Sequence, residues 1–227
     1  MARDGGKGEG EKLRRLPPGR HGLSREFVAQ NQRERLIAGS IAAVAERGFR
    51  ETTVTEISAA AGVSRRTFYA YFQTKDECFL ATFDLLEGHL FAAIAEAAPA
   101  KASWTEQVRA RVAAMLGLFG ENPDLVRFAL VAPPAAGGPV MERNRRLLER
   151  LVGELAAGAP RGRGSAEPTE VEREATAGAI AAVLASKVEA GSDERLGEAS
   201  PELVELVLVP FVGRRRAATA AAKPQSR

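Results

Sequence analysis

One short basic segment, residues 64–75, carries the side chains in this sequence that are best suited to chemistry. The segment contains no acid, and six of its side chains are suited to such chemistry: Arg65, Arg66, Thr67, Tyr69, Tyr71 and Lys75. Guanidinium groups bind guanine edges and phosphates, a threonine methyl group suits thymine, and hydroxyl and ammonium groups bind phosphate oxygens. The segment is therefore equipped for contacts with DNA.

Two short helices joined by a sharp turn would position these side chains. Thr53 and Glu56 have the spacing of a capping box, which starts the first helix. Gly62 permits the abrupt change of direction that a helix-turn-helix needs. Ser64 is a good N-cap for the second short helix. The pattern predicts a helix-turn-helix over residues 53–72.

The second helix has two unlike faces. Phe68 and Phe72 are four residues apart and can both face the core, whereas the arginines and tyrosines lie on or near the opposite face. An ordinary helical hairpin with exposed arginines would need only the caps and the inward phenylalanine pair. Tyr69 and Tyr71 are difficult to justify on such a solvated face, because the phenylalanines already fill the core. The pattern therefore favours a DNA recognition helix over the hairpin.

A longer helix on each side braces this pair. Before it, apolar residues at helical spacing from about residue 24 predict a helix that ends at Gly48, after which Phe49 can fold back on it. After it, Thr74 and Glu77 repeat the capping-box spacing and start a further helix. Lys75 lies at the N-terminus of this helix beside free backbone amides, which favours the binding of a phosphate.

The stretch TTVTEISAAAGVSRRTFYAYFQTKDECF resembles the DNA-binding signature of the TetR family of bacterial regulators, and the match spans about residues 30–80. The signature positions present here are Gly48-Phe49, Thr53-Val54, Ile57, Ala61-Gly62-Val63-Ser64, Phe68-Tyr69, Tyr71-Phe72, Lys75 and Glu77. The resemblance implies base or near-base contacts from Thr55, Arg65, Arg66, Thr67 and Tyr69. It also implies phosphate contacts from Thr53, Ser64, Tyr71 and Lys75. Many relatives carry a small residue, often glycine, at the position of Arg66, so Arg66 adds either a contact of its own or only charge.

The composition and the spacing of helix breakers predict an all-α fold. Alanine is abundant, aromatic residues make up only 6% and β-branched runs are short. Proline and glycine signals separate further helices at about residues 77–97, 103–121, 124–132, 139–157, 169–190 and 200–216. We expect a mobile basic arm at 1–24, a three-helix DNA-binding domain at 25–76, a C-terminal helical domain for ligand binding and dimerisation at 77–216, and a disordered tail at 217–227.

The TetR resemblance implies a homodimer whose last two long helices pair in a four-helix bundle and which binds a palindromic operator. Helices 169–190 and 200–216 are therefore the interface candidates, and their apolar stripes are Ile180, Val183, Leu184 and Val188, and Leu203, Leu206, Val207 and Phe211. Such stripes are equally typical of an ordinary core. The basic arm and the run Arg214–Arg216 either add non-specific affinity for DNA or are merely solvated.

The resemblance also implies a small-molecule effector that binds the C-terminal domain and releases the protein from DNA, with repression as the commoner outcome in the family. Candidate pocket residues are the aromatic and methionine side chains Trp104, Met115, Phe119, Phe128 and Met141. Side chains of these types at helical spacing are more often plain core, so both interpretations stay open at this point.

Other classes of protein find little support in the sequence. With a single cysteine, Cys78, and two histidines, the chain has neither a disulfide pair nor the ligands for a structural zinc, and no cofactor is expected. It shows no catalytic constellation, no apolar leader and no run of apolar residues long enough for a membrane span. We therefore expect a cytoplasmic protein that is not an enzyme, and a helical adaptor without a DNA target is the alternative.

Overall fold

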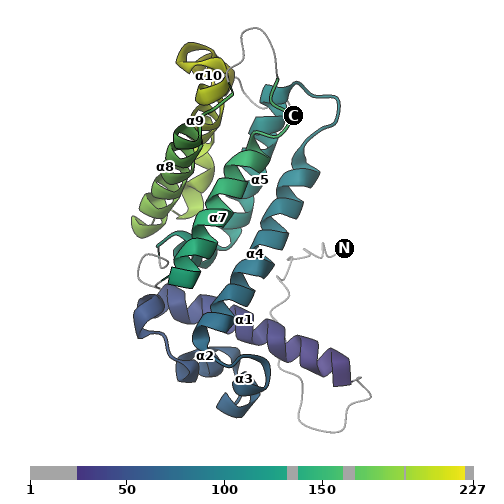
Figure 1. Ribbon diagram of the computed structural model, residues 1–227, viewed down its shortest axis with the longest axis vertical. Coiled ribbons are helices and arrows are strands. Elements are labelled where there is room, and N and C mark those ends of the chain that lie inside the picture. The colour runs from purple at the N-terminus through teal and green to yellow at the C-terminus, as the bar shows by residue number, and fades with distance from the viewer. Residues whose placement is uncertain (1–24, 132–137, 161–166, 192, 223–227) are drawn as a thin grey trace, which may run out of the picture.

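The computed structural model describes residues 25–131, 138–160, 167–191 and 193–222, and every regular element within these ranges is a helix (Figure 1). In chain order the elements are α1 (Arg25–Glu51), α2 (Val54–Ala61), α3 (Arg65–Tyr71), α4 (Lys75–Ala97), α5 (Trp104–Glu121), α6 (Pro123–Val126), the π-helical segment η1 (Arg127–Val131), α7 (Gly138–Leu155), α8 (Glu170–Glu189), the 3-10 segment η3 (Asp193–Ala199), α9 (Ser200–Val212) and α10 (Arg214–Ala221). The expected all-α fold is confirmed. The arm expected at residues 1–24 lies outside the described residues.

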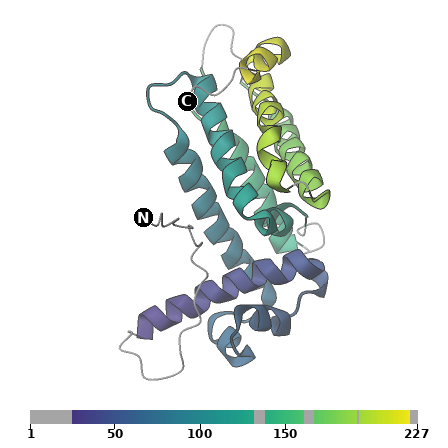
Figure 2. The same ribbon diagram turned by 180° about the vertical axis from the view of Figure 1, so that it is seen from behind.

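Helices α1, α2 and α3 form one end of the molecule, where α1 crosses the N-terminal part of α4 (Figures 1 and 2). Leu36, Ile57 and Phe68, one from each helix, are fully buried in this part of the core. The crossing of α1 and α2 is very close at Gly39, since a Cβ atom there would lie 2.7 Å from the backbone nitrogen of Ala61. Only a glycine fits such an approach without displacing backbone.

The end of α1 agrees with its sequence signal. Gly48 has a φ of 76° and is non-helical, and the chain then makes one further short turn to Glu51. Phe49, which follows the glycine, is buried and its ring lies 4.5 Å from that of Phe79 in α4. The kink at Gly48 therefore directs Phe49 into the interface between α1 and α4.

Helix α4 joins the two parts of the molecule. Its N-terminus begins directly after α3, and its buried residues Phe83, Leu90 and Ile94 continue into the core formed with α5 and α7. By length and composition it is the one described helix that could cross a membrane, but 50% of its apolar stretch is buried inside the protein. It is therefore a core helix.

The apolar stripes of α8 and α9 lie mostly inside a single chain. Five of the eight residues are at most 1% exposed, namely Ile180, Leu184, Val188, Leu203 and Val207. The other three, Val183, Leu206 and Phe211, are half-buried and pack against the same core. Three of the four residues in the α8 stripe and two of the four in the α9 stripe are therefore core and are not free to form an interface.

Two predicted helices are each divided in the structure. The segment 124–132 consists of α6 and the π-helical η1. The segment 200–216 is interrupted at Gly213, whose φ of 77° ends α9 and precedes α10. The expectation of a disordered tail is wrong for residues 217–221, because Ala217 and Ala221 are buried against the rest of the fold, whereas residues 223–227 lie outside the described residues.

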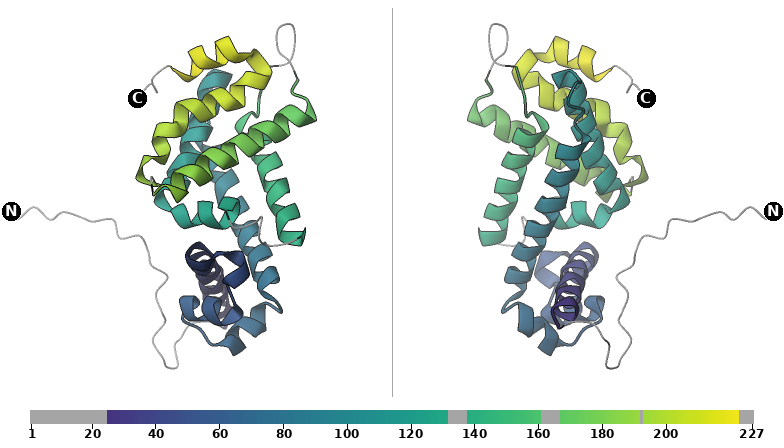
Figure 3. Two further views of the ribbon diagram at one scale, coloured as in Figure 1. Left: turned by 90° about the vertical axis from the view of Figure 1, so that its left-hand side faces the viewer. Right: turned by 90° about the vertical axis from the view of Figure 1, so that its right-hand side faces the viewer.

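Helix α10 lies at the end of the molecule opposite α2 and α3, as the side views also show (Figures 1 and 3). Arg214, Arg215 and Arg216 are exposed there. Because they are so far from α3, these arginines do not add to the basic surface around the helix-turn-helix.

Candidate nucleic-acid interface

The predicted capping box at the start of α2 is present. The amide of Glu56 donates to Thr53 Oγ1 at 3.4 Å, and the amide of Thr53 donates to Glu56 Oε2 at 2.6 Å. The hydrogen bonds from the backbone and side chain of Thr53 lower the pKa of the Glu56 carboxyl, since they stabilise its charged form. Thr53 and Thr55 are both exposed at this end of α2.

The turn between α2 and α3 depends on Gly62. Its φ of 62° and ψ of 36° are left-handed, a conformation that glycine adopts without steric cost. Its amide donates to the Ala59 carbonyl at 3.0 Å, and the next amide, that of Val63, donates to the Ser58 carbonyl at 3.0 Å. These two bonds close the C-terminus of α2 in the manner of a Schellman motif.

Helix α3, the predicted recognition helix, is anchored on one side by aromatic residues. Phe68 is 0% and Phe72 is 3% exposed, as their spacing predicted, and their ring centroids lie 5.7 Å apart. Ser64 caps the helix by accepting from the amide of Thr67 at 3.0 Å. The Ser64 and Thr67 hydroxyls also lie 2.9 Å apart, so both side chains help to start the helix.

The opposite side of α3 is open to solvent. Arg65 and Arg66 are exposed, and Tyr69 is 51% exposed, which is unusual for so large a side chain. Phe68 supports the Tyr69 ring edge-on, with their centroids 5.5 Å apart. The structure thus presents two guanidinium groups and one supported aromatic hydroxyl on a single free helix face.

Tyr71 is placed differently from the prediction. It is half-buried, and its hydroxyl donates to Gln32 Oε1 of α1 at 3.0 Å. Its one donor proton is therefore used within the protein, and Tyr71 holds α3 against α1. The structure thus gives Tyr71 a bracing role, and its phosphate contact stays a prediction.

Lys75 also serves the fold. Its ammonium group donates to the carbonyls of Phe49 at 3.1 Å, Arg50 at 3.2 Å and Thr52 at 2.9 Å. An ammonium group has three donors, and all three are engaged here. It also lies 4.9 Å from the centroid of the Phe49 ring. These bonds form a clamp that ties the start of α4 to the end of α1, and the phosphate contact of Lys75 stays a prediction.

Sequence reasoning missed the contribution of α1 to this site. Gln32, Arg35 and Gly39 lie at i, i+3 and i+7, so they share the face of α1 that meets Tyr71 and the turn. That spacing is visible in the sequence. The sequence could not show the hydrogen-bond partners of Gln32 and Arg35, which lie 26 to 39 positions away in the chain.

Comparison with known proteins decides the family. Residues 36–82 match the model of the bacterial regulatory proteins of the tetR family. The chain therefore carries the DNA-binding domain of TetR-family transcriptional regulators. This family is not enzymatic, in agreement with the sequence. No curated protein gives a significant match.

Solved structures of bacterial regulators share the fold. The fatty acid degradation regulator FadR from Bacillus halodurans has a TM-score of 0.68 and 18% identity, over 78% of this chain and 94% of its own. FadR from Bacillus subtilis, solved with stearoyl-CoA, has a TM-score of 0.63 and 18% identity, over 77% and 96%. A TetR family regulator from Marinobacter aquaeolei has a TM-score of 0.63 and 22% identity, over 83% and 100%.

Four of the five candidate pocket residues belong to the hydrophobic core or pack against it, and only Met141 is exposed. Met115 and Phe119 are buried in α5, and Phe128 in η1 packs against Phe79 and Phe83 of α4.

The other two candidates lie elsewhere. Trp104 stacks edge-on against Phe211, with centroids 5.4 Å apart, and its indole nitrogen donates to the Ala156 carbonyl at 3.2 Å. Met141 is 49% exposed, which places it on the surface and not in the interior that the prediction assumed.

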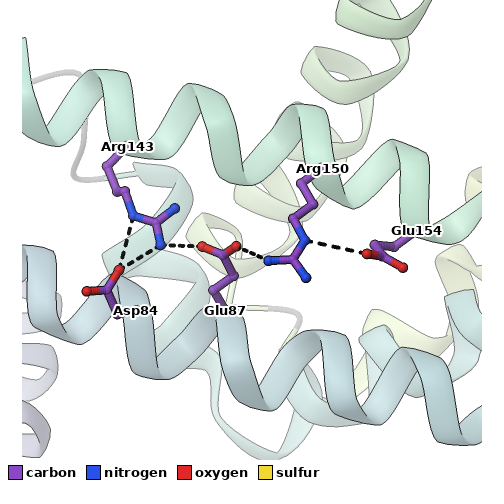
Figure 4. Close-up of polar contacts among 5 residues, drawn as sticks. All are labelled: Asp84, Glu87, Arg143, Arg150 and Glu154. Atoms are coloured by element: carbon purple, nitrogen blue, oxygen red, sulfur yellow. Dashed lines mark hydrogen bonds and ion pairs between the residues drawn. The ribbon is translucent and has the colours of Figure 1, made fainter.

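A polar cluster joins α4 to α7 in this regulator (Figure 4). Glu87, which is only 9% exposed, forms ion pairs with Arg143 and Arg150 of α7. Arg143 also pairs with Asp84 at 2.7 Å, and the Arg150 guanidinium lies 4.1 Å from the centroid of the Phe91 ring. The cluster fixes α7 beside the helix that leads into the DNA-binding domain.

Proposed function

We propose that this TetR-family protein is a cytoplasmic repressor that binds a palindromic operator as a homodimer and is released by a small-molecule effector. The observation that carries the proposal is the free face of α3, where Arg65, Arg66 and Tyr69 are exposed while Phe68 and Phe72 anchor the opposite side. A helix equipped and supported in this way is suited to the major groove.

The contacts divide by chemistry. Arg65 and Arg66 are suited to guanine O6 and N7, and Tyr69 adds a hydroxyl and a ring face beside them. Thr55 and Thr67 are the further candidates for base or near-base contacts. Thr53 and Ser64, exposed at the starts of α2 and α3, are the candidates for phosphate contacts, since phosphates bind well at helix N-termini.

The exposed face of α8 supports the proposed dimer. Val171, Ala175, Gly178 and Ala182 lie at i, i+4, i+7 and i+11, and all four are exposed, Val171 by 73%. Helices with small side chains at the contact approach closely. A two-fold dimer through this face would place two copies of α3 on successive major grooves, about 34–36 Å apart.

The proposed effector would bind in the helical domain over residues 77–216. The Bacillus subtilis neighbour was solved in complex with a small molecule, stearoyl-CoA. Of the candidate residues, Met115, Phe119 and Phe128 are buried in the common core and are the ones an apolar effector would meet. Binding there would couple to α3 through α4, which passes from this domain to the helix-turn-helix.

The experiment is a binding titration on duplexes selected by the wild-type protein from a random pool. Arg65→Ala and Tyr69→Ala should each cost about 1–3 kcal/mol and relax the preference at particular base pairs. Arg215→Ala is the matched control, because it removes an exposed arginine at the far end of the molecule. Unchanged affinity and unchanged site preference in both α3 variants would overturn the assignment.

A further inference from the structure

Arg35 of α1 reaches the turn of the helix-turn-helix. This half-buried side chain donates from Nη2 to the carbonyl of Ala61 at 2.5 Å and to that of Gly62 at 2.8 Å. The contact joins residues 26 and 27 positions apart in the chain. It therefore connects the body of α1 to the two residues at which the chain leaves α2.

The two carbonyls need such a donor. The last carbonyls of a helix have no partner within the helix. At the end of α2 the amides of Val63 and Gly62 already satisfy the carbonyls of Ser58 and Ala59. A cation beside the remaining carbonyls also complements the negative end of the helix dipole. Arg35 is thus a C-terminal cap supplied by another helix.

Two glycines make room for this cap. A Cβ atom on Gly62 would lie 2.7 Å from Arg35 Nη2 and would displace the guanidinium group. A Cβ atom on Gly39, one turn after Arg35, would lie 2.8 Å from the Ile57 carbonyl and would push α2 away from α1. The close approach at Gly39 and the cap at Arg35 therefore both fix the C-terminal end of α2, and the turn that follows it, against α1.

The orientation of α3 depends on the turn at the C-terminal end of α2. Its N-cap, Ser64, follows Gly62 by two residues, and α3 itself has only seven residues. Phe68 and Phe72 fix its inner face, but the entry of the chain into the helix is set by the turn. A small rotation there would shift the exposed guanidinium groups of Arg65 and Arg66 relative to the base edges.

We propose that Arg35 is a positioning residue for base recognition, which fixes the entry of α3 through the turn carbonyls and does not itself bind DNA. This inference rests on the proposed function, because it presumes that α3 reads a specific operator. Arg35 would then govern the specificity ratio, defined as the affinity for the operator divided by that for random duplex. A residue that instead contacts a phosphate would affect both duplexes equally.

The test measures equilibrium binding of wild type, Arg35→Met and Arg35→Gln to the selected operator and to random duplex at several salt concentrations. Stoichiometric titration of the active fraction corrects for unfolded protein. Both neutral variants should lower the specificity ratio by about tenfold, within the range for the loss of one good base contact. The slope of log affinity against log salt should not change, because no phosphate contact is lost.

Controls separate the outcomes. Arg35→Lys should recover part of the specificity ratio, because its ammonium group restores a cationic donor near the turn. Arg47→Gln removes an exposed charge from the same helix without contact to the turn and should leave the ratio unchanged. An unchanged ratio in both neutral variants, or a salt slope reduced by about 0.9 with equal weakening of both duplexes, would overturn the inference. Failure of the proposed function would instead appear in the wild type, as an absence of any operator preference.

Discussion

Replacing Lys75 by methionine distinguishes the clamp from a phosphate contact. The substitution keeps the aliphatic stem and removes the ammonium group together with its hydrogen bonds to the carbonyls of Phe49, Arg50 and Thr52. A hydrogen bond to a charged group contributes about 1.5–3 kcal/mol net, and the cation–π contact with Phe49 about 0.5–1 kcal/mol. The three bonds share one ammonium group and the residue is half-exposed, so their contributions do not add fully.

We expect Lys75→Met to lower the free energy of unfolding by about 2–4 kcal/mol. For a chain of this size the melting temperature should fall by roughly 5–15 °C. Thermal unfolding followed by circular dichroism measures this change, and Lys101→Met, at an exposed lysine between α4 and α5, is the matched control with little expected effect.

DNA binding completes the Lys75 test. The salt slope of the folded variant should equal that of the wild type. An unchanged melting temperature combined with a slope reduced by about 0.9 would refute the clamp and restore the phosphate contact that the family resemblance implies.

Three further predictions concern other parts of the fold. Gly39→Ala should destabilise the protein by about 1–3 kcal/mol in chemical denaturation, since its Cβ atom would meet the backbone of α2, whereas Gly88→Ala, where a Cβ atom meets nothing within 4 Å, should not. Burial raises the pKa of the Cys78 thiol from 9.0 to about 12, so its contribution to stability is fully present below pH 9 and is lost as the pH rises towards 12. Relative to Cys78→Ala, the wild type should therefore lose stability above about pH 9, and parallel curves for the two proteins would contradict this assignment. Glu87→Gln should lower the melting temperature more than Glu149→Gln. The reason is that Glu87 is 9% exposed and faces two arginines, whereas Glu149 forms an exposed ion pair. Equal effects of the two substitutions would show that the α4–α7 cluster adds no stability.

The elements with local signals could be predicted from the sequence. The capping box at Thr53, the turn glycine at position 62 and the inward pair Phe68 and Phe72 each depend on residues within four positions of one another. Their geometry follows from helix spacing alone. The exposed position of Tyr69 followed from the same periodicity.

The roles that depend on distant partners could not be predicted. Lys75 and Tyr71 carry donors suited to phosphate, and only the fold shows that these donors are used by residues 23 to 39 positions away. The stripes of α8 and α9 have the same periodicity whether they face a core or a second subunit, so burial had to decide between the two. Met141 follows a helical pattern that gives no indication of its exposure.

Selection of bound duplexes from a random pool by the wild-type protein shows directly whether α3 reads a palindromic operator. If α3 reads base edges in a two-fold dimer, the selected sequences should contain two inverted half-sites with centres about 34–36 Å apart. Enrichment of no sequence, or of a single half-site without an inverted partner, would show that the protein does not bind a palindromic operator through two copies of α3.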